Sequence, residues 1–356
     1  MGKTKKKKDK VTKGGSLDYV AVGDWHLDKL DKRLGEDAIK LQMAEIRKAC
    51  DYALDNGIKH VIYLGDTADN PRLSYRAIIA IQEHYAYYDR KGLNQHVILG
   101  NHDVEAEDFH ALETLESLIN LGMFDNLKFY KNPEQVWMSG VPFNFLPFPA
   151  DKPIDDINAV NIAHIERPGA LRDNGMKINK GGTEEDDGRK DVWDVGHLHT
   201  PHTVGRTVYA GTLYQTNFGE SLPKSFLHCT ATYDAKKNRI KRDYQRINND
   251  PAFKFFNLEI NELADLKKIE KNPLYLYKLY TNTDIELPKN MLTKHANVIQ
   301  VLGFSSKEEL KELMDTSTAK ITHDVRDGLE EWLTENRGFD AKKVKRAKHL
   351  LDQAGL

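Results

Sequence analysis

The first third of the chain alternates between two spacings of hydrophobic side chains. Short apolar runs predict strands at residues 17–22, 58–64 and 97–99. Between them, apolar positions in residues 36–54 and 73–88 recur at steps of three and four, which predicts amphipathic helices. This order of strands and helices predicts a layered α/β domain with right-handed crossovers.

The pattern changes after a further helix that we expect at residues 109–121. Short strand-like runs follow with no long helices between them. They lie at residues 127–130, 135–138, 143–146, 160–163, 192–195, 207–210 and 226–233. Residues 169–191 are rich in Gly, Lys, Asp and Glu, which predicts an exposed loop.

The last third of the chain predicts smaller units. Strands are expected at residues 254–260, 275–281 and 298–301, with a helix at 262–270. Helical patterns dominate beyond residue 305, with apolar stripes that need a surface to lie on, either in this chain or in another one. We therefore expect a main domain over residues 16–250, a small α+β domain over 251–304 and a helical segment over 305–356.

Composition narrows the classes of protein. Apolar residues make up 40% and charged residues 30% of the 356 residues, and the net charge of −2 gives no global attraction for nucleic acid, so any such binding needs local patches. Two cysteines, Cys50 and Cys229, are too few for a disulfide framework and predict a reducing, cytoplasmic setting. No apolar run approaches the roughly 18 residues of a membrane span, so no membrane partner is expected.

The first 15 residues carry seven lysines and few apolar side chains. Such a run repels itself, which predicts a disordered basic tail. The tail could contact DNA, act as a localisation tag or simply keep the chain in solution, and composition leaves these alternatives open.

Polar side chains follow several of the predicted strands. They are Asp24, His26, Asp66, Asn101, His102, His164, His197 and His199. Oxygen and nitrogen donors without a thiolate suit two first-row divalent ions, Mn²⁺, Fe²⁺ or Zn²⁺, rather than a structural zinc site. A carboxylate such as Asp66 can bridge two ions about 3.5–4 Å apart.

Any one of these residues alone would more often be an ordinary polar residue at a strand end. The metal interpretation depends on their combination within one α/β region. Five other histidines, His60, His84, His96, His110 and His202, show no such pattern, and we interpret them as structural or exposed.

The order of these groups resembles the calcineurin-like metallophosphoesterases. That family shows D-x-H, G-D, G-N-H-D, a lone His and G-H-x-H, which correspond here to Asp24-Trp25-His26, Gly65-Asp66, Gly100-Asn101-His102-Asp103, His164 and Gly196-His197-Leu198-His199. The resemblance spans residues 17–250. It implies a four-layer α/β fold in which helices flank two central mixed β-sheets.

The resemblance also implies roles for the residues. One ion would be held by Asp24, His26, Asp66 and His199, and the other by Asp66, Asn101, His164 and His197. His102 would contact the scissile phosphate and protonate the leaving oxygen, and Asp103 would orient its imidazole.

Further features resemble the Mre/SbcD recombination nucleases, including their bacteriophage members. Leu27 follows D-x-H where phosphoprotein phosphatases usually have glycine, and residues 209–220 resemble the Y-x-G-S/T…F-x-E segment of those nucleases. The order of nuclease domain, capping domain and ATPase-binding helices also matches. Two positions differ from part of that family. Asp28 stands where the family often has glycine, and Asp69 stands where some members have histidine.

This closer resemblance implies a DNA exonuclease or endonuclease that uses two divalent ions, with Mn²⁺ favoured, in DNA end processing, recombination and repair. It implies an ABC-type (SbcC-like) ATPase partner, a homodimer and a cytoplasmic location, which is the host cytoplasm for a bacteriophage protein. Candidate DNA contacts are the N-terminal lysines and Arg72, Arg76, Arg167 and Arg172. The alternatives are a small-substrate phosphodiesterase or phosphatase, or a scaffold without catalysis.

Overall fold

The computed structural model describes residues 14–106, 109–154, 157–172, 176–178, 190–282, 285, 287, 297–304, 307 and 310. The lysine-rich start and, apart from residues 307 and 310, the helical segment predicted over 305–356 lie outside the described residues. So does most of the loop predicted at residues 169–191.

Strand β1 (Gly15–Val22) lies inside a sheet, and both of its faces are buried from Tyr19 to Val22. Leu17, Tyr19 and Ala21 pack into the core between two β-sheets. Val20 and Val22 point the other way, into a core formed with helices. Because side chains alternate along a strand, this single apolar run joins three layers.

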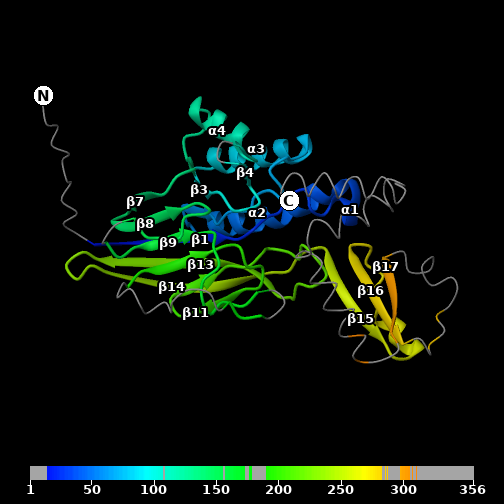
Figure 1. Ribbon diagram of the computed structural model, residues 1–356. Helices are drawn as coiled ribbons and strands as arrows, with labels where there is room; N and C mark the ends of the chain where they lie inside the picture. The colour runs from blue at the N-terminus through cyan, green and yellow to red at the C-terminus, as the bar shows by residue number, and fades with distance from the viewer. Residues whose placement is uncertain are drawn as a thin grey trace, which may run out of the picture.

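Two six-stranded mixed sheets form the sandwich (Figure 1). The first has the order β14 (Arg239–Asn249), β13 (Lys224–Asp234), β1, β2 (His60–Tyr63), β3 (Asn94–Ile98) and β6 (Leu127–Tyr130). The second has the order β11 (His202–Val204), β12 (Thr207–Tyr209), β10 (Val192–Val195), β9 (Val160–Ala163), β8 (Val141–Leu146) and β7 (Glu134–Met138). Strands β1, β2, β3 and β6 run parallel, as do β8, β9, β10 and β12.

Helices lie on the outer side of the first sheet (Figure 1). They are α1 (Asp31–Leu34), the 3-10 turn η1 (Gly35–Asp37), α2 (Ala38–Asp55), α3 (Tyr75–Arg90) and α4 (Glu113–Asn120). The mixed sheets and flanking helices confirm the predicted fold class. No helix in the described part of the chain is both long and apolar enough to cross a membrane.

A third sheet follows, formed by parallel strands β15 (Lys254–Ile260), β16 (Tyr275–Asn282) and β17 (Val298–Phe304). It contacts the sandwich through Gln215, whose amide bonds the Phe255 backbone at both N–H (2.9 Å) and C=O (3.0 Å). The ring of Phe218 stacks on that of Phe255 at 5.0 Å. The domain boundary at residue 250 stays a prediction.

Two expected elements differ from the structure, and one strand was not expected. Residues 109–110 form a short strand, β5 (Phe109–His110), paired with β4 (Val104–Ala106), so α4 begins only at Glu113. The helix expected at 262–270 is a 3-10 turn, η2 (Leu263–Lys268), because none of its residues is buried and no packed face sustains an α-helix. Strand β14 has no apolar pattern because it is a charged edge strand, held by pairing with all of β13.

A buried ionic group links the two sheets. Asp194 of β10 is fully buried and accepts hydrogen bonds from the Tyr19 hydroxyl of β1 and the Arg242 guanidinium of β14. Burial and the neighbouring Asp194 carboxylate raise the pKa of Tyr19 well above its usual value. Removing one member of such a group leaves a buried charge without a partner.

We therefore expect Asp194→Ala to lower the free energy of unfolding by about 3–5 kcal/mol, measured as a lower midpoint in urea denaturation. Asp243→Ala is the matched control. It breaks the exposed Lys241–Asp243 pair, which is worth about 1 kcal/mol or less. Equal losses in the two variants would contradict a stabilising role for the buried group.

Candidate metal centre

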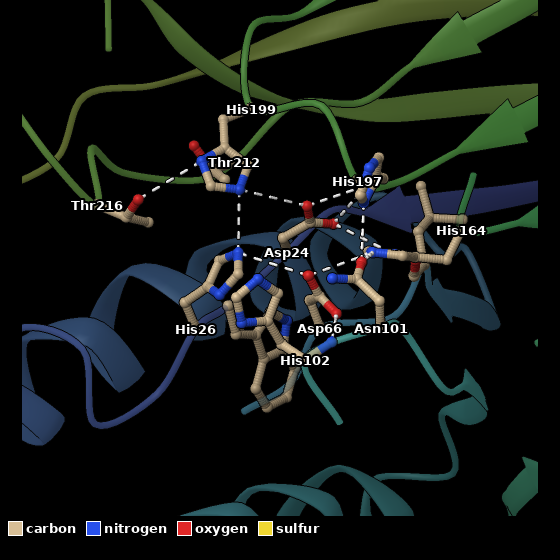
Figure 2. Close-up of polar contacts among 12 residues, drawn as sticks. Asp24, His26, Asp66, Asn101, His102, His164, His197, His199, Thr212 and Thr216 are labelled. Carbon is tan, nitrogen blue, oxygen red and sulfur yellow. Dashed lines mark hydrogen bonds and ion pairs between the residues drawn. The ribbon is translucent and has the colours of Figure 1, made fainter. Parts of the chain in front are cut away.

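The strand ends of both sheets meet at one edge of the sandwich. Asp24 and His26 follow β1, Asp66 follows β2, Asn101 and His102 follow β3, His164 follows β9, and His197 and His199 follow β10. Because the strands that carry them run parallel within each sheet, their carboxyl ends present these loops side by side. All the predicted metal-ligating residues are thereby brought together (Figure 2).

Three of these residues have an unusual backbone conformation. The φ angles of His26, Asp66 and His197 are 46°, 49° and 81°, a region that residues other than glycine rarely adopt. Hydrogen bonds from neighbouring groups hold the loops in this conformation. The Gln42 amide donates to the His26 carbonyl at 3.1 Å, and the His197 N–H donates to Asp24 Oδ2 at 3.0 Å. Strain of this kind concentrates at functional sites.

Two glycines permit the close approach of the loops. A Cβ at position 100 would lie 2.1 Å from Asp66 Oδ1, and one at position 196 would lie 2.7 Å from Asp24 Oδ1. The glycines before Asn101 and His197 are therefore required by the packing of buried carboxylates against the backbone.

The candidate ligands form two groups that share Asp66. In the first group, His26 Nε2 lies 2.9 Å from His199 Nε2, and Asp24 Oδ2 lies 3.7 Å from the same His199 atom. Asp66 Oδ2 lies 3.6 Å from His26 Nε2.

In the second group, Asp66 Oδ2 lies 3.2 Å from His164 Nε2. Asn101 Oδ1 lies 3.0 Å from that nitrogen and 2.8 Å from His197 Nδ1. The Asp66 carboxylate thus lies between the two groups, as a bridging ligand requires.

The two imidazoles of the first group present their Nε2 atoms to each other. His199 Nδ1 lies 2.8 Å from Glu220 Oε1, so its proton is held on Nδ1 and its Nε2 carries a lone pair. His26 Nδ1 lies 3.3 Å from Asp69 Oδ1, but this buried nitrogen makes no hydrogen bond there. Two imidazole nitrogens that face each other beside buried carboxylates are a donor set that suits a divalent cation, so the residues fit a metal ion.

The electrostatics of the buried carboxylates agree with this. Asp24 and Asp66 are each 1% exposed. Burial and the neighbouring Asp66 raise the pKa of Asp24 to about 6. Burial acts against protonation of His164, but Asp66 and Asp24 outweigh it and raise its pKa to about 10. Both pKa values are raised because negative charge is concentrated in this buried site. A bound metal ion would supply the positive charge that balances it.

His102 lies beside the first group. Its Nδ1 donates to the Asp69 carbonyl at 2.7 Å, and its backbone N–H donates to Asp66 Oδ1 at 2.9 Å. Its ring packs edge-on against that of His26, with centroids 4.7 Å apart. Because Nδ1 holds a proton for the carbonyl, Nε2 is the nitrogen available to a substrate.

The environment of Asp103 differs from the one predicted. Its fully buried carboxylate accepts from the backbone N–H groups of Gly100 (2.8 Å) and Ala68 (2.9 Å). The Asp69 carbonyl, rather than Asp103, bonds the His102 imidazole. Asp103 instead ties the loop after β3 to the loop after β2, and burial raises the pKa of its carboxyl to about 7.

Glu220 and Asp69 contact the candidate ligands. Both belong to patterns noted in the sequence, but no role was predicted for either. Glu220 ends the segment that resembles the nuclease pattern, and it orients His199. Burial acts to raise the pKa of Glu220, yet Lys224 and His199 hold it well below its usual value. Asp69 contacts both His26 and His102. Gln42, in the middle of α2, gave no signal in the sequence at all.

The other histidines lie outside the two groups. His84, His96 and His110 are buried, and His60 and His202 are half-buried. Three of the arginines predicted to contact DNA have partners within the protein, and Arg76 is exposed. Arg72 pairs with Glu105, Arg172 pairs with Glu166, and Arg167 lies 4.1 Å from the centre of the Trp193 ring.

Comparisons with known proteins agree with this geometry. A family model described as calcineurin-like phosphoesterase matches residues 17–222. No curated protein matches the sequence. Among the 77 matching chains of solved structures is the crystal structure of TT1561 of Thermus thermophilus. It is 10% identical over 64% of this chain and 98% of that chain, with a TM-score of 0.33.

The family match covers more than half of the chain and contains all of the convergent loops described above. The chain belongs to the calcineurin-like phosphoesterases, a family of metal-dependent hydrolases of phosphoesters.

Proposed function

We propose that this protein is a Mn²⁺-dependent DNA nuclease that hydrolyses phosphodiester bonds with two metal ions. The observation that carries the proposal is the contact of His26 Nε2 with His199 Nε2, beside the shared carboxylate of Asp66. Donors held this close are expected where cations bind, and oxygen and nitrogen donors without thiolate suit Mn²⁺.

We assign the ligands as the resemblance implies. Asp24, His26, Asp66 and His199 would hold one ion, and Asp66, Asn101, His164 and His197 would hold the other. Ions bound there would polarise the phosphoester and lower the pKa of water, so that hydrolysis could proceed near neutral pH.

His102 is the general acid in this proposal. The Asp69 carbonyl fixes the Nδ1 proton and the ring orientation. His102 acts as the imidazolium, with protons on both ring nitrogens. Its Nε2 proton passes to the leaving sugar oxygen as water adds to phosphorus and the P–O bond to the sugar breaks, which leaves the neutral ring with its proton on Nδ1. Asp103 acts indirectly, because its bonds to Gly100 and Ala68 hold the backbone on either side of the site in place.

The choice of DNA as the substrate is supported by how the nuclease-like segments are placed. Leu27 is fully buried, and its N–H donates to the Thr67 carbonyl at 3.1 Å, so it joins the first two ligand loops. Residues 209–220 wrap the site and end in Glu220 on His199. Asp28 has a φ of 74°, a value more typical of glycine. Its carboxylate accepts a hydrogen bond from the N–H of Ser74, the residue directly before α3.

We further propose that residues 305–356 bind an ABC-type ATPase, that the protein is a homodimer, and that it acts in DNA end processing, recombination and repair. These proposals rest on the resemblance and on the predicted apolar stripe of Val325, Leu329, Trp332 and Leu333.

Metal binding is the first test. The wild type should retain two Mn²⁺ ions per chain after equilibrium dialysis, measured by elemental analysis. Asp66→Asn should lose both, because it removes the shared charge. His228→Gln is the control, since His228 contacts Tyr52 outside the centre and its loss should leave both ions. Two ions in Asp66→Asn would contradict the shared-ligand assignment.

Catalysis is the second test. His102→Ala should lower the rate of Mn²⁺-dependent cleavage of linear DNA by about 10²–10⁴-fold with Mn²⁺ content unchanged, while His60→Ala should cleave normally. Normal cleavage by His102→Ala would exclude the general-acid role. Turnover of cyclic nucleotides or phosphopeptides by the wild type without DNA cleavage would exclude the nuclease.

The partner is the third test. The double variant Leu329→Asp/Trp332→Asp should not co-purify with a co-expressed ABC-type ATPase, because it places two charges on the predicted apolar stripe. Glu330→Ala, one residue from that stripe, should co-purify. Unchanged association of the double variant would exclude this stripe as the binding surface.

A further inference from the structure

Lys224, the first residue of β13, is a fully buried cation. Its Nζ lies 2.6 Å from Glu220 Oε2, 2.9 Å from Thr212 Oγ1 and 3.4 Å from the His199 carbonyl. The three acceptors match the three protons of the ammonium group. Burying a lysine is costly, so this arrangement calls for an explanation.

The partner of Lys224 is held equally firmly. Glu220 Oε1 accepts from the Thr216 N–H (3.2 Å), the Asn217 amide (2.9 Å), the Thr216 hydroxyl and His199 Nδ1 (2.8 Å). One oxygen of the carboxylate thus faces the lysine, and the other faces the imidazole. Besides its direct contact with the His199 carbonyl, Lys224 is connected to the His199 ring through the Glu220 carboxylate. That carboxylate contacts Nδ1, whereas the Nε2 of the same ring lies against His26.

Each of three candidate ligand imidazoles contacts a carboxylate, and each of these carboxylates contacts a cation. Asp69 and Lys29, 3.0 Å apart, stand behind His26. Glu166 and Arg172, 2.8 Å apart, stand behind His197. Both side chains of the Glu220–Lys224 pair are 0% exposed, against 25% and 17% for Asp69 and Lys29, and 29% and 47% for Glu166 and Arg172. Water and salt reach and screen these two partly exposed pairs, but not the buried one.

We propose that Lys224 is a positioning residue for metal binding, which acts through Glu220 on His199. This inference rests on the proposed function, because it takes His199 as a metal ligand. Lys224 balances the buried charge of Glu220 and fixes its second oxygen. Glu220 in turn keeps the proton of His199 on Nδ1, so that the Nε2 lone pair faces His26 and Asp24. Partners of this kind typically change metal affinity by about 10–100-fold.

The test is calorimetric titration of the metal-free, full-length protein with Mn²⁺. Lys224→Met keeps the length of the side chain without its charge, and it should weaken one of the two Mn²⁺ sites by about 10–100-fold while leaving the other. Activity of this variant should recover at high Mn²⁺ concentration, so the Mn²⁺ requirement shifts more than the maximal rate.

Arg242→Met is the matched control, because it removes the cation of the other buried ion pair, Arg242–Asp194. It should destabilise the fold without changing either Mn²⁺ affinity. Arg172→Met, at the exposed pair, should change affinity by less than about threefold, as expected for a screened pair. If Lys224→Met does not fold, Glu220→Gln decides the question, since it keeps the shape of the side chain and removes the charge.

The outcomes separate the two proposals. A wild type that binds no Mn²⁺ overturns the proposed function and this inference together. A wild type with two sites, beside a Lys224→Met or Glu220→Gln variant of unchanged affinity, overturns only this inference. Equal weakening in Arg242→Met also overturns it, because the effect would then follow from stability alone.

Discussion

The structure depends on holding close together the carboxylate and imidazole groups of the candidate metal ligands, although these groups repel one another. The carboxylates of Asp24, Asp66 and Asp103 lie buried within one small region, and two imidazole nitrogens of His26 and His199 approach to 2.9 Å. Each burial carries a free-energy cost that only positive charge or hydrogen bonds relieve. The raised pKa values of Asp24 and Asp103, about 6 and 7, show that the cost is not fully relieved by the protein itself. The fold must therefore supply rigidity from elsewhere.

That rigidity comes from the sandwich. The apolar core between the sheets holds the parallel strands in register, and the strand ends then fix where each loop begins. The buried group of Tyr19, Asp194 and Arg242 joins three strands across both sheets. Because His164 and His197 come from one sheet and Asp24 and Asp66 from the other, any slip between the sheets would separate the ligands. Conformational strain at His26, Asp66 and His197 persists only because this framework overrides it.

Much of this arrangement could be predicted from the sequence. Strands β6, β9, β10 and β15 have the expected ends, because each is a short apolar or β-branched run bounded by turn residues. The candidate ligands were also predictable, since each follows its strand directly and its chemistry is local.

Other features depend on contacts between distant residues. Strand β14 forms because it pairs with β13. Its own charged sequence does not predict a strand. Gln42 reaches the His26 carbonyl from α2, and Lys224 reaches the His199 carbonyl from β13. Asp103 adjoins His102 in sequence, yet its carboxylate is used by Gly100 and Ala68. No local pattern encodes such partners, which is why the residues that support the ligands could not all be predicted.

One segment, residues 212–220, connects the metal centre with the third sheet. On one side, Thr216 Oγ1 lies 3.4 Å from His199 Nδ1, and Glu220 bonds the same nitrogen. On the other side, Gln215 pairs with the backbone of Phe255, and the Phe218 carbonyl accepts from the Asn257 amide at 2.7 Å. The residues that orient a ligand therefore alternate with those that anchor β15. The contacts that anchor the third sheet and those that orient His199 therefore come from one short segment.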